Sequence, residues 1–458
     1  MKKRASTLKN LLPFQNILGI VLIFFFALLI SSSTAYCQNN ILKAGIAKTD
    51  ITPTESLYMG GYGLRIGPSD GAYGKIYIRA IVFDDGVKKA AFIEGDVVGY
   101  RDYDGIRERV SNATGIPFEY IILGNVHNHS APTPGGQNAD SEWNKQFNNK
   151  IISTVKKAME NLEPVKIGGG IGHSKIAMNR RKKMKETISY ITYDENAASQ
   201  SFGKYKTDSP VKIREIEGVI RLGANPEGPI DDEVGILRID DMSGRPKAVF
   251  VNYACHATSL GGRSNTISPE WNGHMLEYVE KNIPGVTGIF AQGAAGDINP
   301  RFVGGLDGYK SNLEKTAELG YEIGKEVINV FNSIKTTKPI NPQIRLVHKD
   351  ILCPRNYRDL RNDFKNTTVT VPITAVRIDD FTWVTFPGEL FHEIGKRIKS
   401  STHSKYPFIV GYCNGSVGYL PTQKAFSEGG YEPAGSRFDP ISEHVLVKEI
   451  KNMLIKLF

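Results

Sequence analysis

The chain contains little cysteine. Its four cysteines, among 458 residues, are Cys37, Cys255, Cys353 and Cys413, and they stand far apart in the sequence. Small secreted domains that depend on disulfides carry many more cysteines per residue, so a disulfide framework is excluded, although one bridge is allowed. Free cysteine is commonly a small buried apolar residue, and we interpret Cys255 and Cys413 in this way.

From residue 40 onward the sequence also has no obvious repeat, no linker rich in proline and glycine, and no long block of like charge. Hydrophobic residues make up 40% of the chain, charged residues 23% and aromatic residues 10%. These values are ordinary for a globular protein and exclude a disordered chain, a collagen-like fibre and a protein with many membrane spans.

The net charge is +9, from 57 Lys and Arg against 48 Asp and Glu. Lys2, Lys3, Arg4 and Lys9 supply four of these charges, which leaves 9 − 4 = +5 for the rest of the chain. Both signs are mixed there, so nothing in the sequence supports nucleic-acid binding.

The N-terminus has the pattern of a secretory signal. The basic segment Lys2–Lys9 is followed by an apolar run, Ile17–Ile30, and then by the small residues Ser31–Ala35. The run is short for a membrane-spanning helix, which needs about 20 residues. We therefore predict a signal peptide over residues 1–37 and export to the periplasm or the outside. Lipid anchoring at Cys37 stays open, although Tyr36 is bulky where such signals have a small residue.

Apolar strand-like runs alternate with amphipathic helical stretches over residues 40–458, which predicts a single large mixed-sheet domain of the α/β (mixed α+β) class. A small subdomain is expected around residues 170–235. The predicted strands are Ile76–Phe83, Ala90–Ile93, Tyr120–Leu123, Ala248–Tyr253, Val286–Ala291, Ile373–Ile378, Trp383–Phe386 and Phe408–Tyr412. The predicted helices are Ser141–Leu162, Glu270–Asn282, Lys310–Ile334, Leu390–Ile398 and Ser442–Leu457.

Two histidines, His127 and His129, follow directly after the predicted strand Tyr120–Leu123. In an extended segment, residues i and i+2 point to the same face, so the two imidazoles could converge on one metal ion. A loop with two exposed histidines is an equally good interpretation. A metallo-β-lactamase pattern would need Asp and His shortly afterwards, and Ala131 and Pro132 stand there instead.

Two further residues that can bind a metal also follow predicted strands. His256 comes after Ala248–Tyr253, and Glu389 comes after Trp383–Phe386, where a helix is about to begin. Ligand-binding groups gather at the carboxyl ends of strands in α/β folds. Each has an alternative interpretation: His256 as a core histidine, and Glu389 as a carboxylate that interacts with a helix dipole.

The same segments resemble the neutral/alkaline (non-lysosomal) ceramidase family. Asn125–Pro132 is similar to the family's His-Thr-His-Ser-Gly-Pro motif. Further similar segments, in the family's order, are Ala44–Tyr62, Asn252–Leu260, Phe290–Pro300, Phe386–Glu389, Gly418–Tyr419 and Tyr431–Glu432. The matches cover the family's catalytic domain, and we expect no counterpart here of the C-terminal immunoglobulin-like domain of longer members.

The resemblance implies a zinc hydrolase that cleaves an N-acyl bond, with one zinc ion per chain. It implies the zinc ligands His127, His256, Glu389 and Tyr419. Zinc lowers the pKa of a bound water from 15.7 to about 7 and polarises an amide carbonyl.

The resemblance also assigns residues beside the metal. His129 would act as acid/base or stabilise the oxyanion, and Arg180 and Tyr431 would stand near the reaction centre as oxyanion donors. Arg181-Lys182-Lys183 follows Arg180 where the family has Ser-Pro. We interpret this run as a solvated basic face, and contact with an anionic substrate group is the alternative.

One departure from the family bears on mechanism. The serine of Phe-Ala-Gln-Ser, which has been assigned as a nucleophile, is Gly293 here, so that mechanism is impossible at this position. We interpret Gly293 as part of a tight turn, with room for a bulkier substrate as the alternative, and a metal-activated water remains as the nucleophile.

The expected function is therefore an exported zinc-dependent amidohydrolase, ceramidase-like, that converts ceramide to sphingosine and fatty acid. The alternatives are hydrolysis of other N-acyl or ester substrates such as N-acylated sugars, or a non-catalytic module that keeps the fold. The expected partner is a lipid or other N-acyl small molecule. A peripheral membrane contact and the oligomeric state stay open.

Overall fold

The computed structural model describes residues 41–63, 65–190, 212–306, 310–360 and 366–458. Ile41–Phe458 forms one compact unit. The signal peptide predicted over residues 1–37 lies outside the described residues. Among the residues described, no helix is both long and apolar enough to cross a membrane.

The main sheet has eight strands in the order β12-β10-β9-β6-β1-β3-β4-β5. They are β1 (Lys43–Asp50), β3 (Tyr77–Asp84), β4 (Lys89–Gly95), β5 (Ile121–Asn125), β6 (Glu163–His173), β9 (Glu233–Asp241), β10 (Pro246–Tyr253) and β12 (Thr287–Gln292). The two outermost pairs, β4 with β5 and β10 with β12, are parallel, and the inner pairs are antiparallel. The sheet is therefore mixed, as predicted.

The main sheet opens between its two halves. β1 pairs with β6 only at Lys43 and Ala44. Beyond that point the half that contains β6 diverges from the half that contains β1. A strand of the first half, β12, contacts β1, β3, β4 and β5 of the second half. This contact brings the carboxyl ends of β5, β10 and β12 toward one another, although the strand order places β5 and β12 at opposite ends of the sheet.

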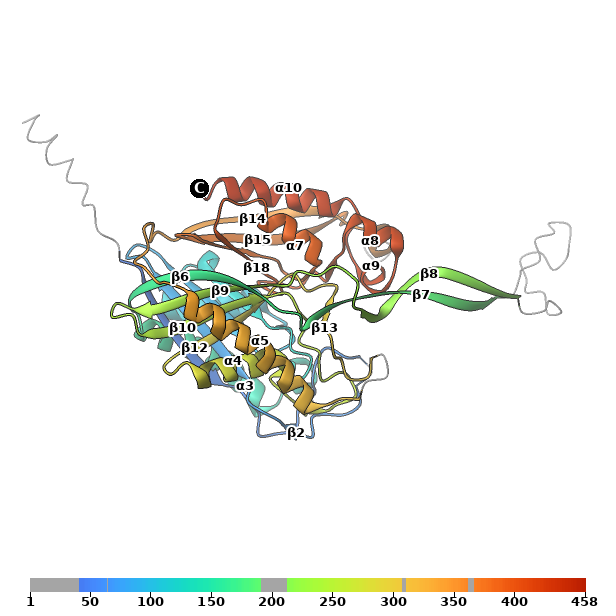
Figure 1. Ribbon diagram of the computed structural model, residues 1–458, viewed down its shortest axis with the longest axis horizontal. Helices are drawn as coiled ribbons and strands as arrows, with labels where there is room; N and C mark the ends of the chain where they lie inside the picture. Colours follow the sequence, from blue (N-terminus) through green and yellow to red (C-terminus); the bar gives the residue numbers. More distant parts are fainter. Residues whose placement is uncertain (1–40, 64, 191–211, 307–309, 361–365) are drawn as a thin grey trace, which may run out of the picture. The chain divides into compact units, whose positions relative to one another are not determined.

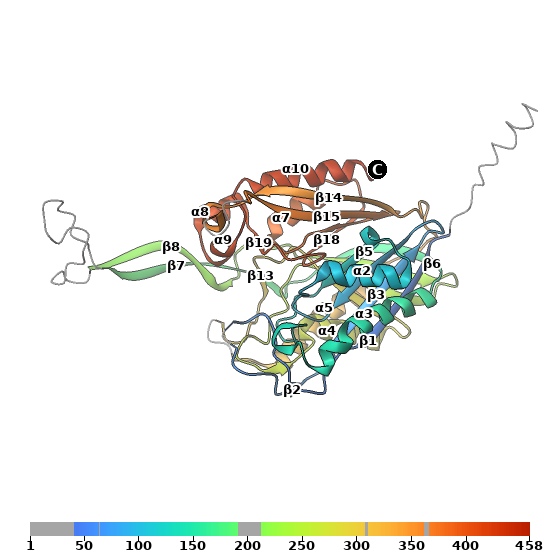
Figure 2. The ribbon, with the colours of Figure 1, turned by 180° about the vertical axis from the view of Figure 1, so that it is seen from behind.

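A second sheet packs on the first and is followed by a further layer of helices (Figures 1 and 2). Its strands, in spatial order, are β14 (Arg345–Pro354), β15 (Thr368–Ile378), β16 (Phe381–Thr385) and β18 (Tyr406–Val410). The helices are α2 (Tyr103–Thr114), α3 (Glu142–Glu160), α4 (Glu270–Asn282) and α5 (Leu313–Ser333) on the main sheet, and α7 (His392–Lys399) and α10 (Ser442–Ile455) on the second.

The strand β3 illustrates the reason for this layering, because it is apolar on both faces. Ile78, Ala80 and Val82 pack into the core beneath α2 and α3, whereas Ile81 and Phe83 point to the other face and join the core between the two sheets. Each fully buried side chain of this size contributes about 1.5–3 kcal/mol of hydrophobic stabilisation. Burial on both faces therefore holds helices, sheet and second sheet together.

Helices α3 and α5 each begin where a polar side chain satisfies one of the first free backbone N–H groups. The Ser141 side chain accepts from the backbone N–H of Asn144 at the start of α3, and the Asn312 side chain accepts from that of Lys315 at the start of α5. Such caps typically contribute about 1 kcal/mol. These two starts lie within three residues of the predicted ones.

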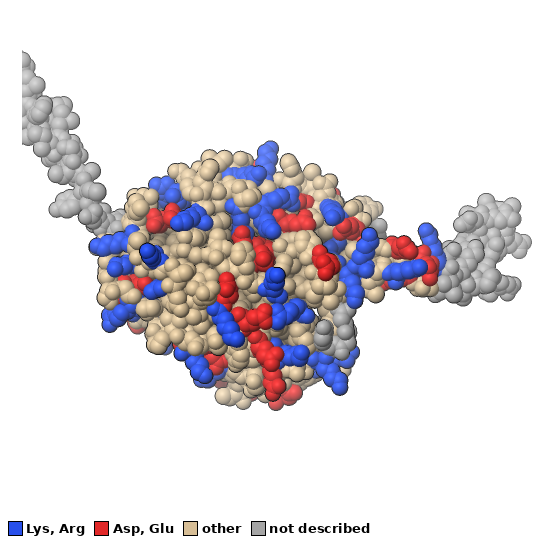
Figure 3. Space-filling view, in the orientation of Figure 1, with Lys and Arg blue, Asp and Glu red and all other residues tan. Residues whose placement is uncertain are grey.

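The stretch expected as a small subdomain contains a long hairpin instead, formed by β7 (Ala177–Tyr190) and β8 (Lys212–Asn225). The short strand β13 (Ile298–Pro300) pairs with the base of β7. The hairpin extends away from the two sheets in Figures 1 and 2. Basic and acidic side chains are mixed along it and over the face shown in Figure 3, in keeping with the mixed charge of the sequence.

The remaining elements are short, and several border the candidate site. They are β2 (Gly71–Ala72), β11 (Thr266–Ile267), β17 (Glu389–Leu390), β19 (Tyr419–Leu420), α6 (Tyr357–Leu360), α8 (Gln423–Glu428), α9 (Tyr431–Gly435) and two 3-10 turns, Phe118–Tyr120 and Gly136–Asn138.

Candidate metal centre

His127 lies on the loop that leaves β5. Its backbone is left-handed there, with φ at 56°, a conformation that is uncommon outside glycine. Its Nδ1 lies 2.9 Å from the carbonyl oxygen of Val98, and its backbone N–H donates to Oδ1 of Asn125 at 3.1 Å. Because Nδ1 donates to a carbonyl, Nε2 carries the free lone pair.

His256 lies on the loop that leaves β10 and is held in the same way. Its Nδ1 lies 2.9 Å from the carbonyl oxygen of Ile298, so its Nε2 also carries a lone pair. That Nε2 is 3.0 Å from Oε2 of Glu389. Two acceptors this close repel each other unless both face a shared cation.

His129 completes the cluster. The residue is half-buried, but both of its ring nitrogens are buried, and neither has a hydrogen-bond partner among the described residues. One nitrogen from each of His127, His129 and His256 lies within 4.8 Å of the others. The backbone of His129 is fixed on both sides, because its N–H donates to Ala257 and its carbonyl accepts from Nη2 of Arg65 at 2.9 Å.

The three imidazoles are neutral at pH 7. Burial lowers the pKa of His127 to about 4 and that of His256 to about 3, and it holds the pKa of His129 well below its usual value. A histidine must be deprotonated to bind a metal. Backbone carbonyls that fix Nδ1, with Nε2 directed inward, are the arrangement usual for metal-binding histidines. The residues present therefore fit a metal ion such as zinc.

Glu389 brings a carboxylate to the same centre. Its Oε1 lies 3.9 Å from Nε2 of His127, whereas its other oxygen, Oε2, makes the contact with His256. Glu389 begins β17, which pairs in parallel with β19, and its direct partner across the pair is Tyr419. The backbones approach closely here, since a Cβ on Gly388 would meet the carbonyl oxygen of Gly418 at 2.4 Å.

Arg180 lies in β7 and connects the β7–β8 hairpin to the centre. Its Nη1 lies 3.3 Å from Nε2 of His256, its Nε donates to Oε1 of Glu432 at 2.8 Å, and its guanidinium lies 5.5 Å from the ring of Tyr419. Burial acts to lower the pKa of Arg180, but Tyr419 and Glu432 raise it well above its usual value. The side chain is therefore a fixed positive charge.

Tyr431 marks the exposed rim of this region. It begins α9, its side chain is 54% exposed, and its ring meets the ring of Tyr419 edge to face at 5.7 Å. The structure thus gathers His127, His129, His256, Glu389 and Arg180 at one centre. Tyr419 joins them through Glu389 and Arg180, and Tyr431 through Tyr419.

The interpretation of Arg181 as part of a solvated basic face was wrong. Arg181 is 8% exposed, and its Nη1 donates to Oε2 of Glu432 at 3.0 Å. The pairing of β7 with β8 shifts register between Asn179 and Arg181. Such a bulge breaks the usual alternation along a strand, so that Arg180 and Arg181 both reach Glu432. Lys183 and Lys185 beyond the bulge are exposed.

Tyr412 is a residue of the centre that the sequence did not reveal. Its ring stacks on His127 with centroids 4.2 Å apart, and its hydroxyl lies 3.4 Å from Nε2 of His256. Burial raises its pKa well above the usual value, so the hydroxyl is a hydrogen-bond donor. It lies in a glycine-rich loop with φ at 54°, where no periodicity or spacing singles it out.

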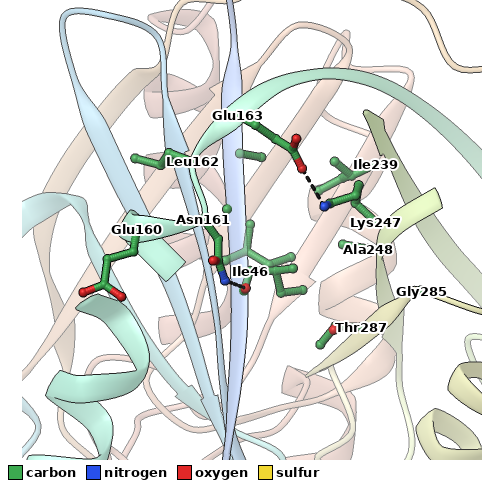
Figure 4. A pocket seen from close by; sticks show the side chains of 13 residues that line it. Ile46, Glu160, Asn161, Leu162, Glu163, Ile239, Lys247, Ala248, Gly285 and Thr287 are labelled. Carbon is green, nitrogen blue, oxygen red and sulfur yellow. Dashed lines mark hydrogen bonds and ion pairs between the residues drawn. The ribbon is translucent and has the colours of Figure 1, made fainter. Parts of the chain in front are cut away.

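A cavity of about 80 Å³ adjoins the centre and is lined by Val98, Tyr100, Tyr103, His127, Glu389 and Tyr412, among others. A larger one, of about 490 Å³, lies where β1 and β6 separate and is lined also by residues of β10 and β12 (Figure 4). Three of its polar side chains are already paired: Glu163 contacts Lys247 at 2.6 Å, and Asn161 donates to the carbonyl of Ile46. None of the histidines lines it, so we place the site at the smaller cavity.

Comparisons with known proteins agree with these observations, although no family model matches the chain. The neutral ceramidase of Drosophila pseudoobscura pseudoobscura is 21% identical over 395 residues, which cover 74% of this chain and 51% of that protein. Neutral ceramidase B of Dictyostelium discoideum is 24% identical over 198 residues, 39% of this chain and 23% of that protein. The chain thus spans about half or less of the length of these curated relatives.

Solved structures match over most of the chain. The neutral ceramidase from Pseudomonas aeruginosa superposes with a TM-score of 0.69 at 16% identity, covering 91% of this chain and 74% of the other. A ceramidase complexed with C2 gives the same TM-score at 14% identity, covering 91% and 75%. The resemblance to the neutral ceramidase family is confirmed. The mixed α/β fold is that of the neutral ceramidases.

Gly293, which replaces the serine of the neutral ceramidase motif, lies at the end of β12. A Cβ at this position would meet the backbone of Ala254 at 2.9 Å. The N–H of Gly293 donates to the carbonyl of Tyr253 at 2.9 Å, which fixes this close approach. With the backbone in this conformation, a serine side chain does not fit at position 293. This agrees with the interpretation of Gly293 as part of a tight turn.

Proposed function

We propose that this protein is an exported zinc-dependent amidohydrolase that cleaves the N-acyl bond of ceramide or a ceramide-like lipid. The observation that carries the proposal is the contact between Nε2 of His256 and Oε2 of Glu389, beside two further neutral imidazoles. This contact is favourable beside a cation, either the guanidinium of Arg180, whose Nη1 lies 3.3 Å from Nε2 of His256, or a bound metal ion, and imidazole with carboxylate is a common zinc donor set. Ceramide as substrate rests on the named relatives and on the shared fold.

His127, His256, Glu389 and Tyr419 would hold the zinc, the set that the family resemblance implies. When bound, zinc would lower the pKa of a water molecule and polarise the acyl carbonyl. The buried position of the centre keeps other water away and strengthens electrostatic interactions in it.

His129 is suited to proton transfer. It is neutral, both of its ring nitrogens lack partners among the described residues, and it adjoins His127 and His256. It would take the proton of the attacking water and deliver it to the leaving amine. Arg180 is positively charged beside His256, and Tyr412 points its hydroxyl there, so both can donate to a developing oxyanion. Tyr431, at the rim, would contact the substrate.

Direct attack by water is favoured because the described serines next to the histidines in sequence, and the position of the motif serine, offer no free hydroxyl. Gly293 has no side chain. Ser130 and Ser259, the serines beside the histidines, are both 0% exposed and donate their hydroxyls to Glu270. A covalent acyl intermediate therefore has no available nucleophile among these residues.

The test is metal analysis of the purified protein followed by a substrate panel of ceramides, N-acyl amino acids and N-acetylated sugars, with and without a chelator. We expect about one zinc per chain and chelator-sensitive release of fatty acid from ceramide. Chelator-sensitive activity on N-acetylated sugars alone would replace the lipid by a different N-acyl substrate. A protein that binds no metal and cleaves nothing would be a non-catalytic module.

A further inference from the structure

Glu270 is a buried carboxylate that joins the two histidine loops, and the proposed chemistry does not use it. It is 0% exposed at the start of α4. Its Oε1 accepts from the hydroxyl of Ser130 at 2.7 Å and from the backbone N–H of Leu260 at 3.1 Å. Its Oε2 accepts from both the backbone N–H, at 2.8 Å, and the hydroxyl of Ser259. Ser130 directly follows His129, and Ser259 lies three residues after His256.

The neighbours of Glu270 make parallel contacts. The backbone N–H of Ser268 donates to the carbonyl of Ser130 at 2.9 Å, and the carbonyl of Ser268 accepts from Nδ2 of Asn128 at 2.8 Å. Nε1 of Trp271 donates to the carbonyl of His256 at 2.8 Å. The segment Ser268–Trp271 is therefore bonded to both loops at several points.

The backbone of Glu270 is strained to make these bonds. Its φ is 56°, in the left-handed region, although it opens a helix and is not a glycine. Such a conformation persists only where the surrounding structure fixes it, and it is concentrated at functional sites. The left-handed conformation of Glu270 therefore indicates that its bonds to the two histidine loops matter for the candidate metal centre.

We propose that Glu270 is a positioning residue whose carboxylate sets the spacing between the imidazoles of His127 and His129 on one loop and that of His256 on the other. A carboxylate accepts at both oxygens, and four donors converge on it here. Glutamine has the same shape but only one accepting oxygen, so its amide NH2 would face N–H and O–H donors. That repulsion would move one loop relative to the other.

The experiment compares Glu270→Gln with Asp85→Asn in the full chain. Asp85 is a matched control, because it is 2% exposed and accepts backbone N–H groups from Val87, Lys88 and Ile344, and it lines neither the cluster nor its cavity. Two readouts are needed: imidazole NMR resonances of the metal-free protein, and zinc affinity by competition with a chelating dye. Only the second rests on the proposed function.

In Glu270→Gln we expect the resonances of His129 and His256 to move, and zinc affinity to fall about 10–100-fold, the usual effect of groups that orient metal ligands. Asp85→Asn should change neither.

Unmoved histidine resonances in a folded Glu270→Gln protein would overturn the positioning role. If that variant does not fold, Ser130→Ala, which removes one of the bonds, must move the same resonances by a smaller amount. A wild-type protein without zinc affinity would reject the proposed function, whereas the resonances still decide the role of Glu270.

Discussion

Oε2 of Glu389 lies 3.0 Å from Nε2 of His256, across 133 residues of sequence. His256 follows β10 of the eight-stranded sheet, and Glu389 follows β16 of the second sheet. The centre therefore lies where the two sheets meet, and it forms only when the core between them is packed. Metal binding and folding should consequently stabilise each other.

The first prediction concerns the metal. His256→Ala should lose most of the zinc, because it removes a neutral imidazole and leaves the Glu389 carboxylate without its partner. Zinc per chain, measured by atomic emission after gel filtration, checks this. His173→Ala is the control, since the His173 side chain is 64% exposed beside Asp232. A fully loaded His256→Ala protein would remove His256 from the ligand set.

The second prediction separates a ligand from a proton carrier. The resemblance places His129 beside the metal, whereas the structure brings a ring nitrogen of His129 within 4.8 Å of those of His127 and His256. We expect His129→Ala to keep its zinc and to lose about 10²–10⁴-fold in kcat, the scale of a general acid/base. Loss of zinc in parallel with activity would make His129 a ligand.

The third prediction concerns pH. Burial lowers the pKa of His127 to about 4 and that of His256 to about 3. In the unfolded chain both would titrate near 6.5, so the unfolded state binds more protons below that pH. The free energy of unfolding of the metal-free protein should therefore fall as the pH drops from about 6.5 to 4. Each histidine contributes about 1.4 kcal/mol per pH unit in the steepest part.

Urea unfolding across this pH range measures the effect, and a His127→Gln/His256→Gln double variant isolates it from the carboxylates that also titrate. The slope for the double variant should be smaller than that for the wild type. Equal slopes would mean that these imidazoles are not held neutral in the folded protein.

The fourth prediction concerns Gly293. Introducing the serine of the resembled ceramidase motif with Gly293→Ser should destabilise the protein by about 1–3 kcal/mol, because the new Cβ meets the backbone of Ala254 at 2.9 Å. It should not raise activity. Gly63→Ser is the matched control, since nothing lies within 4 Å of a Cβ there. A Gly293→Ser protein as stable as the control, with increased turnover, would reinstate a serine mechanism.

The sequence predicted the parts of the fold that follow from local periodicity. The eight predicted strands and five predicted helices all correspond to observed elements. The positions of His127, His256 and Glu389 after strands also indicated a common site. What no local pattern reports is the opening between β6 and β1, which brings β12 against β5 and thereby joins the loops.

The missed residues share a physical reason. The side chains of Tyr412 and Glu270 reach their positions because the backbone is left-handed at both residues. The residue type does not reveal such a conformation in advance. Arg181 was misjudged because a bulge in β7 disrupts the alternation on which the interpretation relied. Sites assembled from loops depend on such irregular backbone conformations, whereas strands and helices are revealed by the periodic spacing of their apolar residues.

The last prediction concerns Tyr412. Tyr412→Phe removes only the hydroxyl, which lies 3.4 Å from Nε2 of His256, and it keeps the ring that stacks on His127. Because burial raises the pKa of this hydroxyl well above its usual value, it remains a neutral donor across the working pH range. We therefore expect the variant to fold and retain zinc but to lose about 10–10³-fold in kcat with little change in KM, as for an oxyanion donor used mainly in the transition state. Tyr253→Phe is the control, because its buried hydroxyl donates to the backbone carbonyl of Ser174, and Tyr253 belongs neither to the cluster nor to the lining of the adjoining cavity. An unchanged kcat in Tyr412→Phe would restrict Tyr412 to packing against His127, and a raised KM with unchanged kcat would make it a substrate-binding group.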